Sequence, residues 1–306
     1  MPAASLRALL TQAIDYAGLF PPASLELEPA LRNYAEYNRQ QEAWMLGPFI
    51  LPVAQFNAAA RAPSQFENEN PLRVSALGPR TDNAEAFLQS LSAAMDSIGP
   101  FLAASGGTAS VVQFEMPLPR EVNADLLQAI ASRIDPRLAT FWEAPANAAE
   151  RVAGLMAGIN RVNPGRNQLG FKLRTGGVTA EAFPTSAEIA GALVSAGNQQ
   201  VPIKFTAGLH HPVRIFHESV QTKMHGFLNV LCEGALALEH QWNETDIIRM
   251  LDDEDPASFS FTDDFFAWRD CEIPTAKISA RRVLVTSLGS CSVDEPRGDL
   301  RALKLL

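Results

Sequence analysis

Short apolar runs alternate along the chain with longer amphipathic segments. The runs are apolar at successive positions, which is typical of parallel strands covered on both faces. They comprise Trp44–Pro52, Leu72–Leu77, Val111–Pro117, Leu138–Ala144, Gln168–Leu173, Val201–Thr206 and Gly226–Leu231. Ala13–Phe20 is a weaker run that predicts a first strand, and with it the sequence predicts eight.

The segments between these runs carry apolar residues at helical spacing. They include Leu25–Gln41, Asn83–Ile98, Asn123–Ile134, Asn147–Val162 and Ser186–Ala196. Repeated strand–helix alternation predicts right-handed βαβ units, and eight such units close into a barrel. We therefore predict an α/β fold of the (β/α)8 TIM-barrel type. An open, doubly wound sheet is the alternative, but no G-x-G-x-x-G follows the first strand.

The last part of the chain breaks this pattern. We expect residues 1–245 to form the barrel and residues 246–306 to form a C-terminal extension packed on it, too small to be an independent domain. The aromatic stretch Phe259–Trp268 is expected to cover the barrel rim or to act as a lid. Val283–Leu288 is a further strand candidate, which would make the weak first strand dispensable.

Composition narrows the classes of partner. The chain has 306 residues, of which 47% are hydrophobic and 19% charged, as in ordinary globular proteins. Its net charge of −9 makes nucleic acid an unfavourable partner, although a small anion could still bind locally. No apolar run approaches the roughly 18–20 residues that span a bilayer, so no membrane segment is expected.

The cysteines bear on the compartment. Three widely spaced cysteines, without a CxxC pair, fit a reducing cytoplasm better than a disulfide framework or a structural zinc site. We therefore expect a cytoplasmic protein, and a homo-oligomer is left open.

Polar side chains gather at the predicted carboxyl ends of the strands, where the chemistry of barrels takes place. They lie mostly in the second half of the chain. They are Glu115 on strand four, Glu143 on strand five, Lys172 and Arg174 on strand six, Lys204 and Thr206 on strand seven, His210 and His211 in the loop after it, and His225 and Asn229 beside and within the predicted strand eight.

The alternation of side chains along a strand decides which of these residues face the lumen. Lys172 and Arg174 are two residues apart, as are Lys204 and Thr206, so each pair shares a face. A lysine facing the helices would be buried without a partner, at high cost. We therefore expect both lysines to point into the barrel, where proximity and desolvation should depress the pKa of at least one.

The same residues also admit a simpler interpretation, in which the lysines are salt-bridged and Glu115 and Glu143 are only their counter-ions. Arg174 followed by Gly176 and Gly177 favours an anionic ligand, because a guanidinium can orient a carboxylate or phosphate and glycines let backbone amides approach it.

Several segments carry a resemblance that extends over nearly the whole chain. They resemble a family of uncharacterised bacterial proteins. Because that family has no established activity, the resemblance assigns no catalytic residues to this chain. The segments are Ile14–Pro22, Phe171–Gly177, Lys204–Pro212, Met224–Asn229 and Gly289–Ser292.

Strands six and seven are also similar to the paired-lysine pattern of class I, deoxyribose-phosphate-type aldolases. That resemblance implies that Lys172 is the Schiff-base lysine, that Lys204 lowers its pKa and that Glu115 takes the place of the family's acid. Arg174 and the His210-His211 pair have no counterpart in the pattern.

Three classes of function follow. The first is a lyase that acts on a small anionic carbonyl substrate through Lys172, with His210 or Glu115 moving protons. The second is a metal-dependent hydrolase or isomerase using His210, His211 and His225 with Glu115 or Glu143. No H-x-H or H-E-x-x-H spacing supports it, so no metal or other cofactor is favoured, although a divalent ion is left open. The third is a barrel that binds a small anion without catalysis.

Overall fold

Eight parallel strands close into a barrel in the computed structural model, which describes residues 1–61, 65–67, 69–165 and 168–306. The order around the barrel is β1-β13-β7-β6-β5-β4-β3-β2. The strands are β1 (Ile14–Tyr16), β2 (Leu46–Pro52), β3 (Leu72–Leu77), β4 (Ala109–Pro117), β5 (Ala139–Glu143), β6 (Leu169–Arg174), β7 (Ile203–Thr206) and β13 (Val285–Ser290). The predicted (β/α)8 fold with a C-terminal extension is confirmed.

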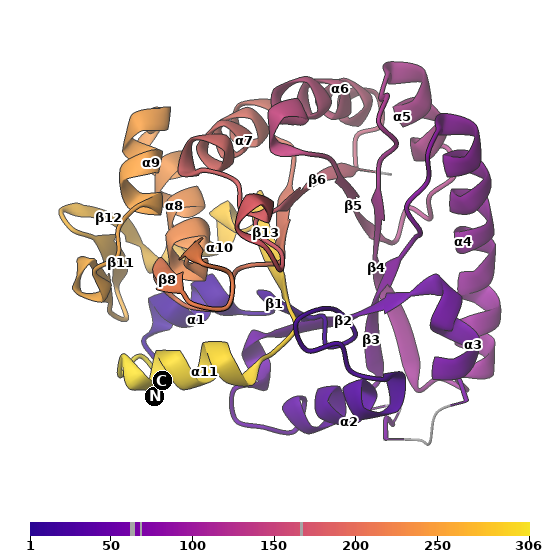
Figure 1. The fold of residues 1–306 in the computed structure, drawn as a ribbon, viewed down its shortest axis with the longest axis horizontal. Helices are drawn as coiled ribbons and strands as arrows, with labels where there is room; N and C mark the ends of the chain where they lie inside the picture. The colour runs from indigo at the N-terminus through magenta and orange to yellow at the C-terminus, as the bar shows by residue number, and fades with distance from the viewer. Residues whose placement is uncertain (62–64, 68, 166–167) are drawn as a thin grey trace.

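Helices surround the strands and cover their outer face (Figure 1). They are α1 (Ala4–Leu10), α2 (Leu27–Tyr37), α3 (Phe56–Ala59), α4 (Ala84–Ala104), α5 (Ala124–Ala131), α6 (Ala149–Val162), α7 (Ser186–Gln199), α8 (Phe227–His240), α9 (Glu244–Leu251), α10 (Thr275–Arg281) and α11 (Asp294–Ala302). Short 3-10 helices occupy Ala43–Met45, Val53–Gln55, Ala146–Ala148, Ala180–Ala182 and Pro256–Ser258. In the described part of the chain, no helix is both long and apolar enough to cross a bilayer.

The eighth strand is where the sequence prediction fails. Gly226–Leu231, predicted as a strand, instead forms the start of helix α8. Every residue from Phe227 to Leu236 is buried, and a helix buried on all sides looks like a buried strand when only a short window is considered. The barrel is closed instead by β13, which pairs in parallel with β1 and β7.

This closure changes the boundary of the barrel. Strand β13 overlaps the strand candidate Val283–Leu288, and the weak first strand is also present as β1, so both complete the eight. The barrel strands therefore reach beyond residue 245, into the segment predicted as an extension.

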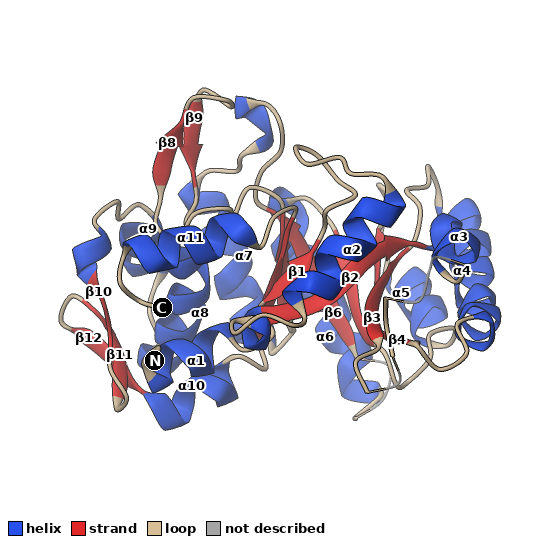
Figure 2. Cartoon of the chain, turned by 90° about the horizontal axis from the view of Figure 1, so that it is seen from below, coloured by secondary structure: helices blue, strands red, loops and turns tan. Residues whose placement is uncertain are grey.

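Extra elements fill the interval between β7 and β13. Two antiparallel pieces occur there, a hairpin of β8 (Ile215–His217) and β9 (Thr222–Met224) and a sheet of β10 (Phe259–Phe261), β11 (Phe265–Trp268) and β12 (Cys271–Pro274). Figure 2 shows the hairpin projecting from the body and the three-stranded sheet lying in the outer layer. The aromatic stretch predicted as a rim cover or lid forms part of that sheet, which contacts α1, α8 and α10.

Candidate functional site

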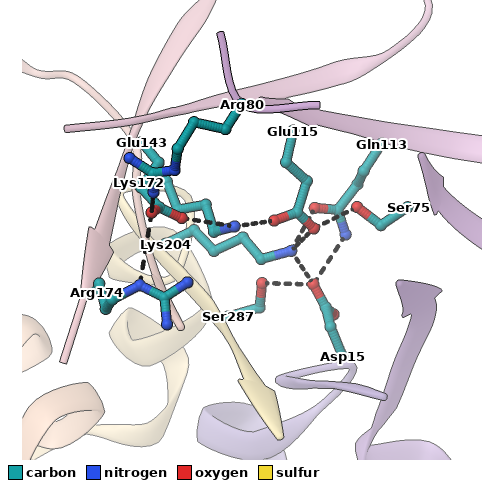
Figure 3. Close-up of polar contacts among 10 residues, drawn as sticks. All are labelled: Asp15, Ser75, Arg80, Gln113, Glu115, Glu143, Lys172, Arg174, Lys204 and Ser287. Atoms are coloured by element: carbon teal, nitrogen blue, oxygen red, sulfur yellow. Dashed lines mark hydrogen bonds and ion pairs between the residues drawn. The ribbon is translucent and has the colours of Figure 1, made fainter. Parts of the chain in front are cut away.

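Two lysines from neighbouring strands meet acidic side chains inside the barrel (Figure 3). Lys172 on β6 and Lys204 on β7 are direct neighbours in the parallel register. Both side chains point inward, with Lys204 fully buried and only 5% of the Lys172 side chain exposed. This confirms the orientation that side-chain alternation predicts, although each ammonium pairs with two carboxylates, of which Glu115 is shared.

Lys204 lies at the deeper end of this network. Its Nζ donates hydrogen bonds to Asp15 Oδ2 and, at 2.6 Å, to Glu115 Oε1. Ser287 Oγ donates to the same Asp15 oxygen at 3.2 Å, and Ser75 Oγ donates to Glu115 Oε1 at 2.5 Å. The Lys204 ammonium therefore ties β7 to β1 and β4 across the barrel interior.

Lys172 lies nearer the barrel mouth and shares one acid with Lys204. Its Nζ is 2.9 Å from Glu115 Oε2 and 3.1 Å from Glu143 Oε2. Glu143 Oε1 in turn faces two more exposed cations, Arg174 Nε at 3.5 Å and Arg80 Nη2 at 3.4 Å. Acids and bases thus alternate from the buried Asp15 to the arginines at the surface.

The charges set the pKa directions in the cluster. Burial by itself would raise the pKa of Glu115, but Lys172 and Lys204 outweigh burial and lower it to about 2. Burial opposes ionisation of Glu143 too, yet Lys172, Arg174 and Arg80 bring its pKa below the usual value. Burial raises the pKa of Asp15, and the attraction of Lys204 offsets only part of that effect.

The expected depression of a lysine pKa is wrong in direction for Lys204. Burial would lower the pKa of Lys204, but the carboxylates of Asp15 and Glu115 outweigh it and raise the pKa. The prediction considered two like charges in a dry site and omitted Asp15 on β1, the second acid that pairs with Lys204. The counter-ion interpretation of Glu115 and Glu143 therefore matches the geometry.

Two cavities at the barrel mouth border Lys172. One, of about 270 Å³, is lined by Lys172, Arg174, Thr206, His210 and, from the β6 loop, Gly177. The other, of about 600 Å³, is lined by Lys172 and Arg174 with Arg80 and Glu143. Volumes of this order accommodate small molecules, so some of the residues predicted from the sequence, Lys172, Arg174 and His210 among them, lie on cavity walls.

The glycines after β6 have a packing role in addition to any contact with a ligand. A Cβ on Gly176 would lie 2.7 Å from the Cα of Gly208 in the loop after β7. Gly208 itself has a φ of +77°, which favours glycine. The two loops therefore approach each other at a distance that side chains would prevent, while Gly177 faces the smaller cavity.

His210 and His211 follow β7, and their side chains take different carboxylate partners. His210 Nδ1 is 3.2 Å from Glu295 Oε2, and His211 Nδ1 is 2.7 Å from Asp299 Oδ2. Burial lowers the pKa of His210, although Glu295 opposes the effect. Near neutral pH this favours an uncharged imidazole, which is able to accept a proton.

Cys291 also borders the smaller cavity, but its surroundings do not favour a nucleophile. Burial raises the pKa of its thiol, and its Sγ lies 3.9 Å from the same His210 nitrogen that faces Glu295. A catalytic relay needs the thiol and the carboxylate on opposite nitrogens of the ring.

His225 and Asn229 do not lie on a barrel strand, which corrects the prediction that placed them beside and within strand eight. Asn229 is buried on α8, where it donates to Met250 O at 2.7 Å and Asp253 O at 2.9 Å and accepts from Arg214 N at 2.9 Å. These bonds use the side chain to join α8 to neighbouring loops. Asn229 therefore has a structural role in the fold.

His225 lies just after β9 and also has fixed partners. Arg214 Nη1 donates to its Nδ1 at 3.0 Å, because an arginine can only donate. Nε2, 2.7 Å from Pro184 O, must then carry the ring proton. Burial lowers the pKa of His225, in agreement with this neutral tautomer.

A metal centre built from the three histidines finds no geometric support. Within the described ranges, no group of three or more His, Cys, Asp or Glu side chains is arranged to hold a metal ion. His210, His211 and His225 each contact a different partner, as described above. The expectation that no cofactor is favoured, with a divalent ion left open, stays a prediction.

Several residues of the network were not predicted from the sequence. Asp15 is the most important, and the signal for it was present, since an acid in the middle of the apolar segment Ala13–Phe20 needs a buried partner. Gln113, Ser75 and Ser287 also face the lumen from strands and bond the acids or Lys204. Uncharged side chains of this kind give no comparable signal.

Comparisons with known proteins add little to this description. No protein-family model matches the chain, and comparison with curated protein sequences finds no match either. Among solved structures, UMP synthase from Leishmania donovani aligns over 66% of this chain and 43% of its own, with 15% identity and a TM-score of 0.38. The aligned part is less than half of that protein, and a superposition this distant carries no functional argument.

Proposed function

We propose that this chain is a barrel enzyme that acts on a small anionic carbonyl compound, with Lys172 as the reactive side chain. One observation carries the proposal. A single cavity at the carboxyl ends of β6, β7 and β13 brings Lys172, Arg174 and His210 to its walls. One small molecule in this cavity could therefore contact a proton donor in Lys172, an anion-binding guanidinium in Arg174 and a base in His210.

Arg174 is the proposed anchor of the substrate anion. Its side chain is 51% exposed and contacts Glu143 at 3.5 Å, a weak pairing that leaves guanidinium donors free for a ligand. A carboxylate or phosphate would accept two parallel hydrogen bonds from such a fork. Arg80, 71% exposed on the other side of Glu143, adds positive charge to the same mouth.

Lys172 is the proposed acid for the carbonyl oxygen. Its ammonium lies between two carboxylates and can polarise a carbonyl group and stabilise the oxyanion of an enolate. His210 would take the proton, either from the carbon next to the carbonyl or from the hydroxyl of an aldol. In the aldol case the carbon–carbon bond then breaks and its electron pair forms the enolate, which His210 reprotonates at carbon.

A Schiff base on Lys172 is a second route that the geometry permits. The Nζ must first pass a proton to Glu115 Oε2 or Glu143 Oε2, which lie 2.9 and 3.1 Å away. The free amine can then attack the carbonyl carbon, and the carbonyl oxygen leaves as water. This route requires one proton transfer before the chemistry begins, and two acceptors lie within reach of the Nζ.

The test uses a panel of pyruvate, 2-oxobutyrate and dihydroxyacetone phosphate. In D₂O, NMR should show exchange of the protons next to the carbonyl for at least one compound, and Lys172→Met should abolish the exchange. Lys223→Met is the matched control, because Lys223 is an exposed lysine paired with Glu254. Borohydride trapping with mass spectrometry separates the routes, since only the Schiff base leaves an adduct on Lys172.

Two results would overturn the proposal. One is the absence of exchange, cleavage and adduct for the whole panel, including the case in which these anions bind without reacting, as in a purely binding barrel. The other is exchange that persists unchanged in folded Lys172→Met protein.

A further inference from the structure

A further cavity, separate from the two at the mouth, lies at the opposite end of the barrel. It has a volume of about 370 Å³ and lies between helices α7, α8 and α9. Its walls include Ile203 and Val285, the first residues of β7 and β13. The smaller of the two mouth cavities instead borders Thr206 and Gly289, near the carboxyl ends of the same strands. The cavity between the helices is therefore a separate site from the smaller mouth cavity.

The walls of this cavity combine apolar side chains with three amide residues, Asn198, Gln200 and Gln241. Leu193 and Val194 come from α7, Leu238 from α8 and Ile247 from α9, and the indole of Trp242 completes the lining between the last two helices. Of the described residues that line it, Glu233 alone carries an ionisable side chain. The cavity thus combines apolar side chains and neutral amides with one acidic group.

Glu233 is buried without compensation. It is 0% exposed, and neither carboxyl oxygen has a hydrogen-bond partner among the described residues. Glu115 is also 0% exposed, but two lysines and a serine bond to it. A buried polar group without a partner destabilises the folded state, and such groups in native proteins call for a specific explanation.

We propose that the cavity at α7, α8 and α9 binds a small organic amine, with its ammonium group against the Glu233 carboxylate and its apolar body against the helix walls. An ammonium supplies the donors that the carboxyl oxygens lack. Trp242 adds an aromatic surface, to which cations are attracted. An organic anion would be repelled, and a neutral alcohol would satisfy the acid only in part.

Binding of an amine should release a proton. Burial raises the pKa of Glu233 well above its ordinary value, which favours the protonated carboxyl in the free protein. When an ammonium ion enters, the acid gives its proton to the solvent and the two charges pair. A proton released on binding would therefore indicate that the amine pairs with the Glu233 carboxylate.

Isothermal titration calorimetry with three matched compounds tests the proposal: phenethylamine, phenethyl alcohol and phenylacetate. Phenethylamine should bind at least tenfold more tightly than the alcohol, and phenylacetate should bind most weakly. Titrations in two buffers of different ionisation enthalpy should show a proton released with the amine alone.

Variants separate the cavity from general surface effects. Glu233→Gln keeps the shape of the side chain and should weaken amine binding at least tenfold, while Glu36→Gln, an exposed change on α2, should leave it unaltered. Ala237→Leu adds volume at the cavity wall and should block the amine without touching the acid.

The proposal is overturned by equal binding of amine and alcohol, by an affinity unaffected by both Glu233→Gln and Ala237→Leu, or by the absence of amine binding at millimolar concentration. Far-UV circular dichroism of each variant shows whether a loss of binding reflects the cavity or a loss of fold. If Glu233→Gln proves unfolded, Ala237→Leu and the proton release decide.

Discussion

Lys204→Met tests the claim that the buried network is held by mutual compensation of charge. Methionine keeps much of the length of lysine but removes the ammonium that bonds Asp15 and Glu115. Among the described residues, Glu115 retains Lys172 and Ser75 as partners, whereas Asp15 retains the uncharged Ser287 and Gln113. The cost therefore falls mainly on Asp15, as an uncompensated charge in a fully buried position.

The magnitude follows from the burial of the pair. Removing one partner of a buried ion pair destabilises proteins by about 3–5 kcal/mol, and we expect about 3 kcal/mol here because Asp15 can take up a proton instead. Lys223→Met removes an ion pair of the same kind whose partners are 48% and 45% exposed, and it should cost about 1 kcal/mol or less. Urea unfolding followed by tryptophan fluorescence measures both.

Two further measurements sharpen this test. Adding Asp15→Asn to Lys204→Met should recover part of the lost stability, because it removes the charge that has no counter-ion. The loss in Lys204→Met should also shrink as the pH falls, since protonation of Asp15 relieves the same charge. If Lys204→Met costs no more than Lys223→Met at pH 7, the reasoning about buried charge compensation is refuted.

Three further predictions concern stability. The pKa of Glu115 falls from 4.5 to about 2 on folding, so its contribution to the free energy of unfolding is complete above pH 4.5 and about 3 kcal/mol of it is lost as the pH falls toward 2. The free energy of unfolding plotted against pH should therefore show a flatter acid limb in Glu115→Gln than in the unmodified protein, and parallel limbs would contradict this. Asn229→Ala leaves two carbonyls and one amide without their partner and should cost about 3 kcal/mol or more in urea unfolding, whereas a cost under 1 kcal/mol would deny its structural role. Gly234→Ala would place a Cβ 2.4 Å from a Val285 methyl group and should cost about 1–3 kcal/mol of stability. Gly191→Ala, with open space around it, should instead stabilise the protein by up to about 1 kcal/mol. Equal shifts of the thermal midpoint in the two variants would refute the packing argument.

Seven of the eight barrel strands follow from local pattern, as does the inward orientation of Lys172 and Lys204. Strand alternation and the high cost of a lysine facing helices are local physical rules, so no partner strand has to be known. The same reasoning failed at Gly226–Leu231, because a short apolar run does not distinguish a buried helix from a buried strand.

The protonation of the site was decided by tertiary structure. Asp15 and Lys204 are 189 positions apart in the chain, and Lys172 and Glu115 meet only because β4 and β6 lie on either side of β5. A sequence specifies which side chains need compensation, since that depends on residue type and local burial. Which charge supplies it depends on the closure of the barrel, and electrostatic interactions act through distances in space that the order of residues does not contain.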